Sequence, residues 1–68
     1  MFNSEYLREL RYKKNITMRQ VADSVGVAES TICCYETGKR QPSLITVKRL
    51  ADFYKINWTK FFRDLKNK

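Results

Sequence analysis

The sequence of 68 residues has no histidine, one proline, two glycines and two cysteines. Without histidine, a zinc site would need cysteines or carboxylates from several chains to reach four ligands, so we expect no metal site. Paired carboxylates in an apolar setting are also missing, and no nucleophile can be matched with a base and an orienting group. These absences predict a binding protein that is not an enzyme, with no cofactor and no small-molecule ligand.

The two cysteines, Cys33 and Cys34, are adjacent in the stretch TICCYETG. Neighbouring α-carbons across a trans peptide lie about 3.8 Å apart, whereas a disulfide normally needs roughly 4.4–6.8 Å. The pair therefore cannot form an intramolecular disulfide, and its position needs another explanation.

Long hydrophobic runs are absent too, because no apolar run exceeds four residues and a membrane span needs roughly 18. The opening MFNSEYLREL carries charges at once and lacks the apolar region of a secretion signal. We expect no membrane partner and a cytoplasmic location, where cysteines stay reduced.

Positive charge is what the chain has in excess. Fourteen Lys and Arg against seven Asp and Glu give a formal net charge of +7, which favours a polyanionic partner, nucleic acid ahead of membrane. Solubility alone is the alternative interpretation of that charge.

The composition is that of a globular protein, at 43% hydrophobic and 13% aromatic residues. With no repeat or linker, it predicts one domain over residues 1–68, with a core at about 5–62 and a short basic C-terminal tail.

Glycine, proline and capping residues divide the chain into helix-length pieces. Thr17 and Gln20 form a capping box, and Gly26 and Gly38 stand where helices end in a left-handed residue. Two short helices around Gly26 make a helix-turn-helix. We expect an all-α fold of five short helices and no strand, with the helices near residues 5–14, 17–26, 28–37, 44–54 and 58–65.

The stretch ITMRQVADSVGVAESTICCYETGKRQPS, residues 16–43, resembles the phage lambda repressor/Cro (Xre-like) family of helix-turn-helix proteins. The resemblance covers about Leu7 to Phe62 and rests on fixed spacing between small, turn and anchor residues. Met18 and Lys55 depart from the family, which often has a polar residue and a glycine at these places. The spaced positions are Ala22, Gly26, Ile32, Glu36, Gly38 and Pro42.

The resemblance implies that the third helix enters the major groove of double-stranded DNA. On a helical wheel with Ile32 and Tyr35 facing the core, Ser30 and Thr37 point outward, and Cys33 and Cys34 lie on either side of that direction. We expect bases to be read by Ala28, Glu29, Ser30 and Cys34. Glu29 has an equally good alternative role, as an acid that favours the start of the helix.

Affinity is expected from contacts to phosphates, or beside them, by residues that flank the base-reading set. These residues are Thr17, Arg19, Cys33, Thr37, Lys39 and Arg40. For any single lysine, a solvated surface charge is an equally good reading, but together these cations favour DNA. By family analogy, Arg11 and Glu36 form a structural ion pair between the first and third helices.

One helix-turn-helix buries little surface, so the family implies a two-fold dimer on near-palindromic DNA. The aromatic C-terminal part is the expected dimer interface, with Phe62 and Leu65 favoured over Trp58, which the core also needs. A DNA-binding transcriptional regulator, as a repressor, is the leading hypothesis. The alternatives are an antitoxin-like or other protein-interaction module and a thiol-based redox-sensing regulator.

Overall fold

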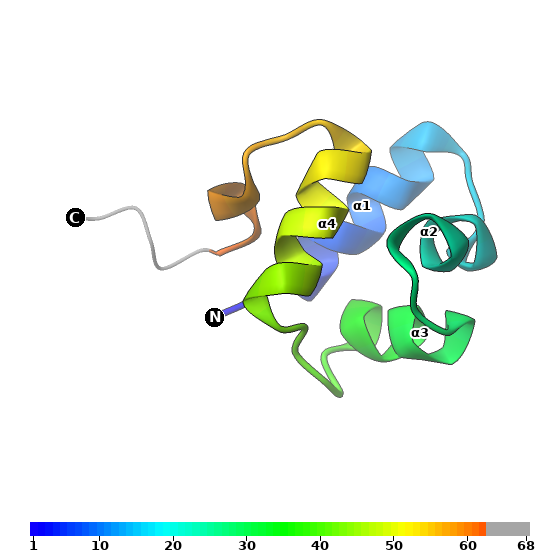
Figure 1. Ribbon diagram of the computed structural model, residues 1–68, viewed down its shortest axis with the longest axis horizontal. Coiled ribbons are helices and arrows are strands. Elements are labelled where there is room, and N and C mark those ends of the chain that lie inside the picture. Colours follow the sequence, from blue (N-terminus) through cyan, green and yellow to red (C-terminus); the bar gives the residue numbers. More distant parts are fainter. Residues whose placement is uncertain (63–68) are drawn as a thin grey trace.

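The computed structural model describes residues 1–62, which form four α-helices and one 3-10 helix (Figure 1). The α-helices are α1 (Ser4–Lys14), α2 (Met18–Val25), α3 (Glu29–Thr37) and α4 (Leu44–Tyr54), and the 3-10 helix is η1 (Trp58–Phe61). Within residues 1–62 the only β-pairing is one isolated antiparallel bridge between Phe2 and Phe62. The expected all-helical class is therefore confirmed, with this bridge as an addition.

The prediction of a fifth α-helix is wrong in the described residues 58–62, where the chain makes the 3-10 turn η1 instead. Asn57 does cap it, since its side-chain oxygen accepts from the Thr59 N–H at 3.0 Å. Phe62 then leaves helical geometry, at φ −121° and ψ 115°. Its pairing with Phe2 requires this extended backbone, so the helix ends before it. Leu65, one of the residues expected at a dimer interface, lies outside the described residues.

Local sequence accounts for most helix ends. The Thr17 hydroxyl accepts from the Gln20 N–H at 3.1 Å, and the Thr17 N–H donates to the Gln20 amide at 2.8 Å, which completes the expected capping box. Gly26 ends α2 at φ 78°. Lys55 ends α4 in the same left-handed region at φ 59°, where glycine would carry no steric penalty. The third helix begins at Glu29 because Ala28 is its extended N-cap residue.

The helices enclose one small core, with α3 along the lower edge of the view in Figure 1 and α2 above it. Helix α4 packs on α2 and on η1, while α1 supports α3. The core includes Phe2, a residue for which the sequence predicted no role. None of the helices in residues 1–62 has the length and apolar character needed to cross a membrane. The side chains with no more than 1% exposure are Leu7, Val21, Ala22, Ile32, Glu36, Val47, Leu50 and Phe61.

Candidate nucleic-acid interface

Helix α3 has one buried face and one exposed face. Ile32, Tyr35 and Glu36 are buried against the rest of the molecule. The exposed face is made of small or polar side chains with Glu29 at its start, and Cys34 lies half-buried at its edge. Such a face can approach the edges of bases without steric obstruction. Its exposed residues are Ala28, Glu29, Ser30, Cys33 and Thr37.

The end of α3 is joined firmly to the basic loop that follows it. The carbonyl oxygen of Cys34 accepts from the backbone N–H groups of Gly38, Lys39 (3.0 Å) and Arg40 (3.3 Å). Gly38 permits this close turn because it lies at φ 82°. Lys39 and Arg40, both exposed, are thus attached through their backbone to the same helix that presents the small polar face.

An ion pair between α1 and α3 fixes the inner side of this helix. Arg11 Nε donates to Glu36 Oε2 at 2.7 Å, and Arg11 Nη2 donates to Glu36 Oε1 at 3.0 Å. The Glu36 residue is 1% exposed and the Arg11 side chain 12%. The hydrogen bonds with Glu36 raise the pKa of Arg11, against the opposing effect of burial. Two parallel bonds of this kind restrict the orientation of both side chains.

Two further residues surround this pair. Arg8 on α1 donates from Nη1 to the Glu36 carbonyl oxygen at 2.9 Å, which satisfies a carbonyl near the C-terminal end of α3. Tyr54 on α4 is buried, and within residues 1–62 its hydroxyl has no hydrogen-bond partner. Burial, followed by the negative charge of Glu36, raises the pKa of Tyr54 to about 12. Neither residue was predicted from the sequence to belong to this cluster.

The start of α2 supplies a second polar group. Thr17 and Arg19 are exposed, but the capping box already uses the Thr17 backbone N–H and one lone pair of its hydroxyl. The hydroxyl proton of Thr17 stays available for an external acceptor.

At the end of α3, the Thr37 hydroxyl instead donates to the carbonyl oxygens of Cys33 (2.9 Å) and Cys34 (3.3 Å). A Thr37 hydroxyl in this geometry can accept, but not donate, an external hydrogen bond.

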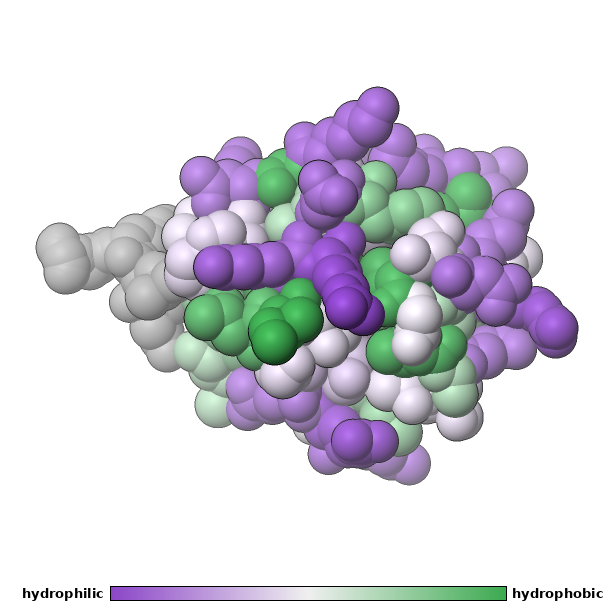
Figure 2. Space-filling view, in the orientation of Figure 1, coloured by the Kyte–Doolittle hydropathy of each residue, from purple (hydrophilic) through white to green (hydrophobic). Residues whose placement is uncertain are grey.

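Hydrophobic side chains also reach the surface away from α3. Ile45 is 68% exposed and Leu44 50% exposed in the first turn of α4. Figure 2 shows hydrophobic side chains at the surface over this region, next to hydrophilic ones. Trp58 and Phe62, expected at a dimer interface, are half-buried and pack edge to face with ring centroids 5.9 Å apart. Sequence reasoning assigned Leu44 to the core because it fits the apolar rhythm of this helix, and it assigned no role to Ile45, whose neighbours at helical spacing, Lys48 and Arg49, are charged.

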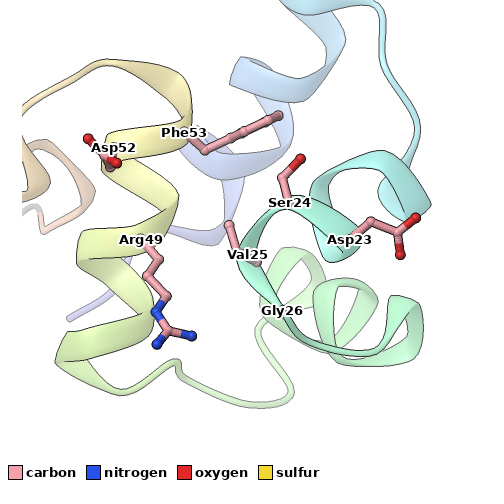
Figure 3. Close-up of a pocket in the computed structure, with 7 residues that line it drawn as sticks. All are labelled: Asp23, Ser24, Val25, Gly26, Arg49, Asp52 and Phe53. Carbon is pink, nitrogen blue, oxygen red and sulfur yellow. The ribbon is translucent and has the colours of Figure 1, made fainter.

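A cleft of about 500 Å³ lies between the end of α2 and α4 (Figure 3). Its two acids, Asp23 and Asp52, point to opposite sides, and Arg49 extends from α4 below them in the view of Figure 3. The two carboxylates therefore do not form a pair suited to acid–base chemistry. In the part of the chain that the structure describes, Cys, Asp and Glu side chains do not gather in a group of three that could hold a metal ion.

The sequence profile of a family described as helix-turn-helix matches residues 7–61. The chain belongs to this lambda-repressor-like helix-turn-helix family. The transcriptional repressor RstR of the cryptic phage CTXphi from Vibrio cholerae is 39% identical over 56 residues, which are 82% of this chain and 50% of RstR. The chain spans about half the length of the curated relatives that it matches first.

Two solved structures share the fold of this chain. The restriction-modification controller protein C.AhdI from Aeromonas hydrophila superposes with a TM-score of 0.81 at 30% identity, over 87% of this chain and 89% of C.AhdI. The P22 c2 repressor, solved in complex with a synthetic operator, gives a TM-score of 0.86 at 19% identity, over 93% of this chain and 96% of the repressor. The second likeness concerns the fold alone.

Proposed function

We propose that this protein is a cytoplasmic, sequence-specific transcriptional regulator that represses by binding double-stranded DNA. In this proposal two copies bind a near-palindromic operator, each with α3 in the major groove. The observation that carries the proposal is the small polar face of α3, which continues directly into the backbone-anchored cations Lys39 and Arg40. The name of its relative RstR, a transcriptional repressor, supports the sign of regulation.

The exposed residues of α3 suit the reading of base edges. Ser30 can donate to or accept from most bases, and Glu29 can accept from the amino group of cytosine. Because phosphate repels Glu29, it would select between sequences without adding affinity. Ala28 and the half-buried Cys34 can contact a thymine methyl group. Cys33 would approach the flanking backbone.

Affinity in this proposal comes from the phosphates on either side of the groove. Thr17 and Arg19 at the start of α2, and Lys39 and Arg40 after α3, would contact these phosphates. Thr37 takes part only if its hydroxyl releases the carbonyls of Cys33 and Cys34. If each subunit neutralises about three phosphates, the logarithm of the binding constant falls against log salt with a slope of about −5 for the dimer.

The dimer surface in this proposal is the apolar region around the start of α4 and η1. Half-sites one helical turn apart place the two recognition helices about 34 Å from each other, so their thiols cannot bridge across the operator. Trp58 and Phe62 alone expose little, whereas Leu44 and Ile45 add the largest exposed aliphatic side chains of α4. Ile45→Glu should shift sedimentation toward the monomer, and an exposed control, Lys13→Glu, should not.

Random-site DNA selection followed by footprinting tests the proposed function. We expect an enriched near-palindrome whose half-sites are about 10 base pairs apart, protected over both halves. Failure of the selection to enrich any sequence contradicts the proposal and favours an antitoxin-like interaction module. Binding that is lost with oxidant and retained in a Cys33→Ser, Cys34→Ser variant would instead identify a thiol-based sensor.

A further inference from the structure

The N-terminal segment Met1–Ser4 is attached to the C-terminal end of the described chain. Phe2 is 5% exposed and stacks on Phe61, with ring centroids 5.2 Å apart. It also meets the edge of Phe62 at 6.1 Å. The Asn3 N–H donates to the Phe61 carbonyl oxygen at 2.6 Å. Aromatic packing and a short backbone hydrogen bond thus hold this segment against η1.

The same segment touches the loop that follows α3. The Phe2 N–H is directed at Oε1 of Gln41 over 3.5 Å, a long hydrogen bond. A Cβ atom added at Gly38 would lie 3.6 Å from Ser4 Oγ, so the first residue of α1 faces the start of the loop across the space that the glycine leaves open. Asn3 in turn caps α1 by accepting from the Tyr6 N–H at 3.1 Å. Residues 2–4 therefore bond to Gln41 at the end of the loop Gly38–Gln41 and face Gly38 at its start.

We propose that Phe2 and Gln41 are positioning residues for DNA binding. In this proposal Met1–Ser4 acts as a strap that holds the loop Gly38–Gln41 at a place set by η1. Lys39 and Arg40 lie within the loop, and their backbone N–H groups already bond to the Cys34 carbonyl oxygen. The strap fixes the other side of the loop. The proposal rests on the proposed function, because it concerns how these two cations meet phosphate.

Holding a loop before it binds raises affinity, because less conformational entropy is lost on binding. The strap also joins the loop to the apolar region proposed as the dimer surface. Phe2 packs on Phe62, and Phe62 packs on Trp58 at 5.9 Å. Any change in packing around η1 would therefore reach the cations through Phe2 and Gln41. No residue of the strap touches a base in this arrangement, so the effect should be equal for all DNA sequences.

Amide hydrogen exchange tests the strap in the free protein, without DNA. The N–H groups of Gly26 and Val27 bond to the Ala22 carbonyl oxygen at 2.9 and 3.1 Å, in the same type of helix end as Lys39 and Arg40. They serve as an internal control within each sample. In Gln41→Ala we expect exchange at Lys39 and Arg40 to rise about threefold or more, consistent with the loss of one weak hydrogen bond, while Gly26 and Val27 stay unchanged. Unchanged exchange at all four amides overturns the proposal.

Phe2→Leu tests the other end of the strap and keeps most of its apolar burial. Because this substitution also lowers global stability, the quantity compared is the exchange of Lys39 and Arg40 relative to the control amides. We expect that ratio to rise in the wild-type background and to change little when Gln41 is already alanine. Independent, additive effects of the two substitutions contradict a path through Gln41.

DNA affinity completes the test. Against the sequence enriched by random-site selection, Gln41→Ala should raise the Kd about threefold to tenfold, and equally for mismatched sites. Accelerated loop exchange with an unchanged Kd overturns the positioning role, although the proposed function stands. Absence of any selective DNA binding by the wild type refutes the proposed function and the positioning role together. The exchange result then still decides whether residues 2–4 restrain the loop.

Discussion

Replacing Glu36 by alanine is the most severe single test of how α3 is held. The substitution leaves the Arg11 guanidinium without the two oxygens of the Glu36 carboxylate, which accept its hydrogen bonds at 2.7 and 3.0 Å. Breaking a buried ion pair from one side costs about 3–5 kcal/mol. Arg11 keeps one bond to the Ile16 carbonyl at 3.2 Å and its side chain is 12% exposed. Because it can turn partly to water, we expect the lower end of that range, about 3 kcal/mol.

A loss of this size is a large part of the stability of so short a chain. At 0.05–0.15 kcal/mol per residue, 68 residues give a total of roughly 3–10 kcal/mol. For a domain of this size, about 3 kcal/mol lowers Tm by roughly 12–24 °C. Thermal unfolding followed by circular dichroism measures this shift. The control is the double variant Arg11→Met, Glu36→Leu, which removes both charges. Its loss of stability should be smaller than the sum of the losses in Arg11→Met and Glu36→Leu measured separately.

A Tm change below about 3 °C for Glu36→Ala would contradict the reasoning, because it corresponds to under 1 kcal/mol in a domain of this size. Strict additivity in the double variant would contradict it as well. Either result would mean that α3 is held mainly by its apolar face, through Ile32 and Tyr35, and by the bond from Arg8 to the carbonyl of residue 36.

Three further predictions concern single side chains. The folded state holds the Tyr54 proton more tightly, with a pKa of about 12 against about 10 unfolded. The stability that this shift adds to the folded state is therefore fully present below about pH 10, and roughly 2–3 kcal/mol of it is lost as the pH rises to about 12. Urea unfolding at pH 9 and 11.5 should show a smaller loss of stability in Tyr54→Phe than in the wild type. Cys34→Ser should change the sequence preference in random-site selection, while Cys33→Ser should keep most binding; an unchanged preference for Cys34→Ser refutes its base-facing role. Arg40→Gln should make the salt slope of a dimer shallower by about 2, and an unchanged slope would place Arg40 away from phosphate.

Helix ends and the helix-turn-helix could be predicted because their signals are local. The capping box of Thr17 and Gln20 and the left-handed glycines are written in adjacent residues, and the geometry they demand leaves few alternatives. The outward face of α3 followed from helical periodicity once Ile32 and Tyr35 were taken to face the core. The Arg11–Glu36 pair needed the family resemblance, because residues 25 positions apart give no local sign of contact.

The features that sequence reasoning missed depend on tertiary contacts. Phe2 joins the core through its stacking on Phe61 and its bridge to Phe62, and Phe62 leaves helical geometry at the end of the 3-10 turn. Arg8 meets the Glu36 carbonyl across 28 positions of sequence. Tyr54 fitted an apolar rhythm, which does not reveal that its hydroxyl is buried near an ion pair.

The central claim, that α3 and its flanking cations contact DNA, is tested most directly by nuclear magnetic resonance of the labelled protein titrated with the selected operator. We predict the largest backbone shift changes at Ser30, Cys33, Lys39 and Arg40, with a weaker and more uniform response to a scrambled duplex. Largest changes confined to Ile45 and Trp58, or none that distinguish operator from scrambled DNA, would contradict it.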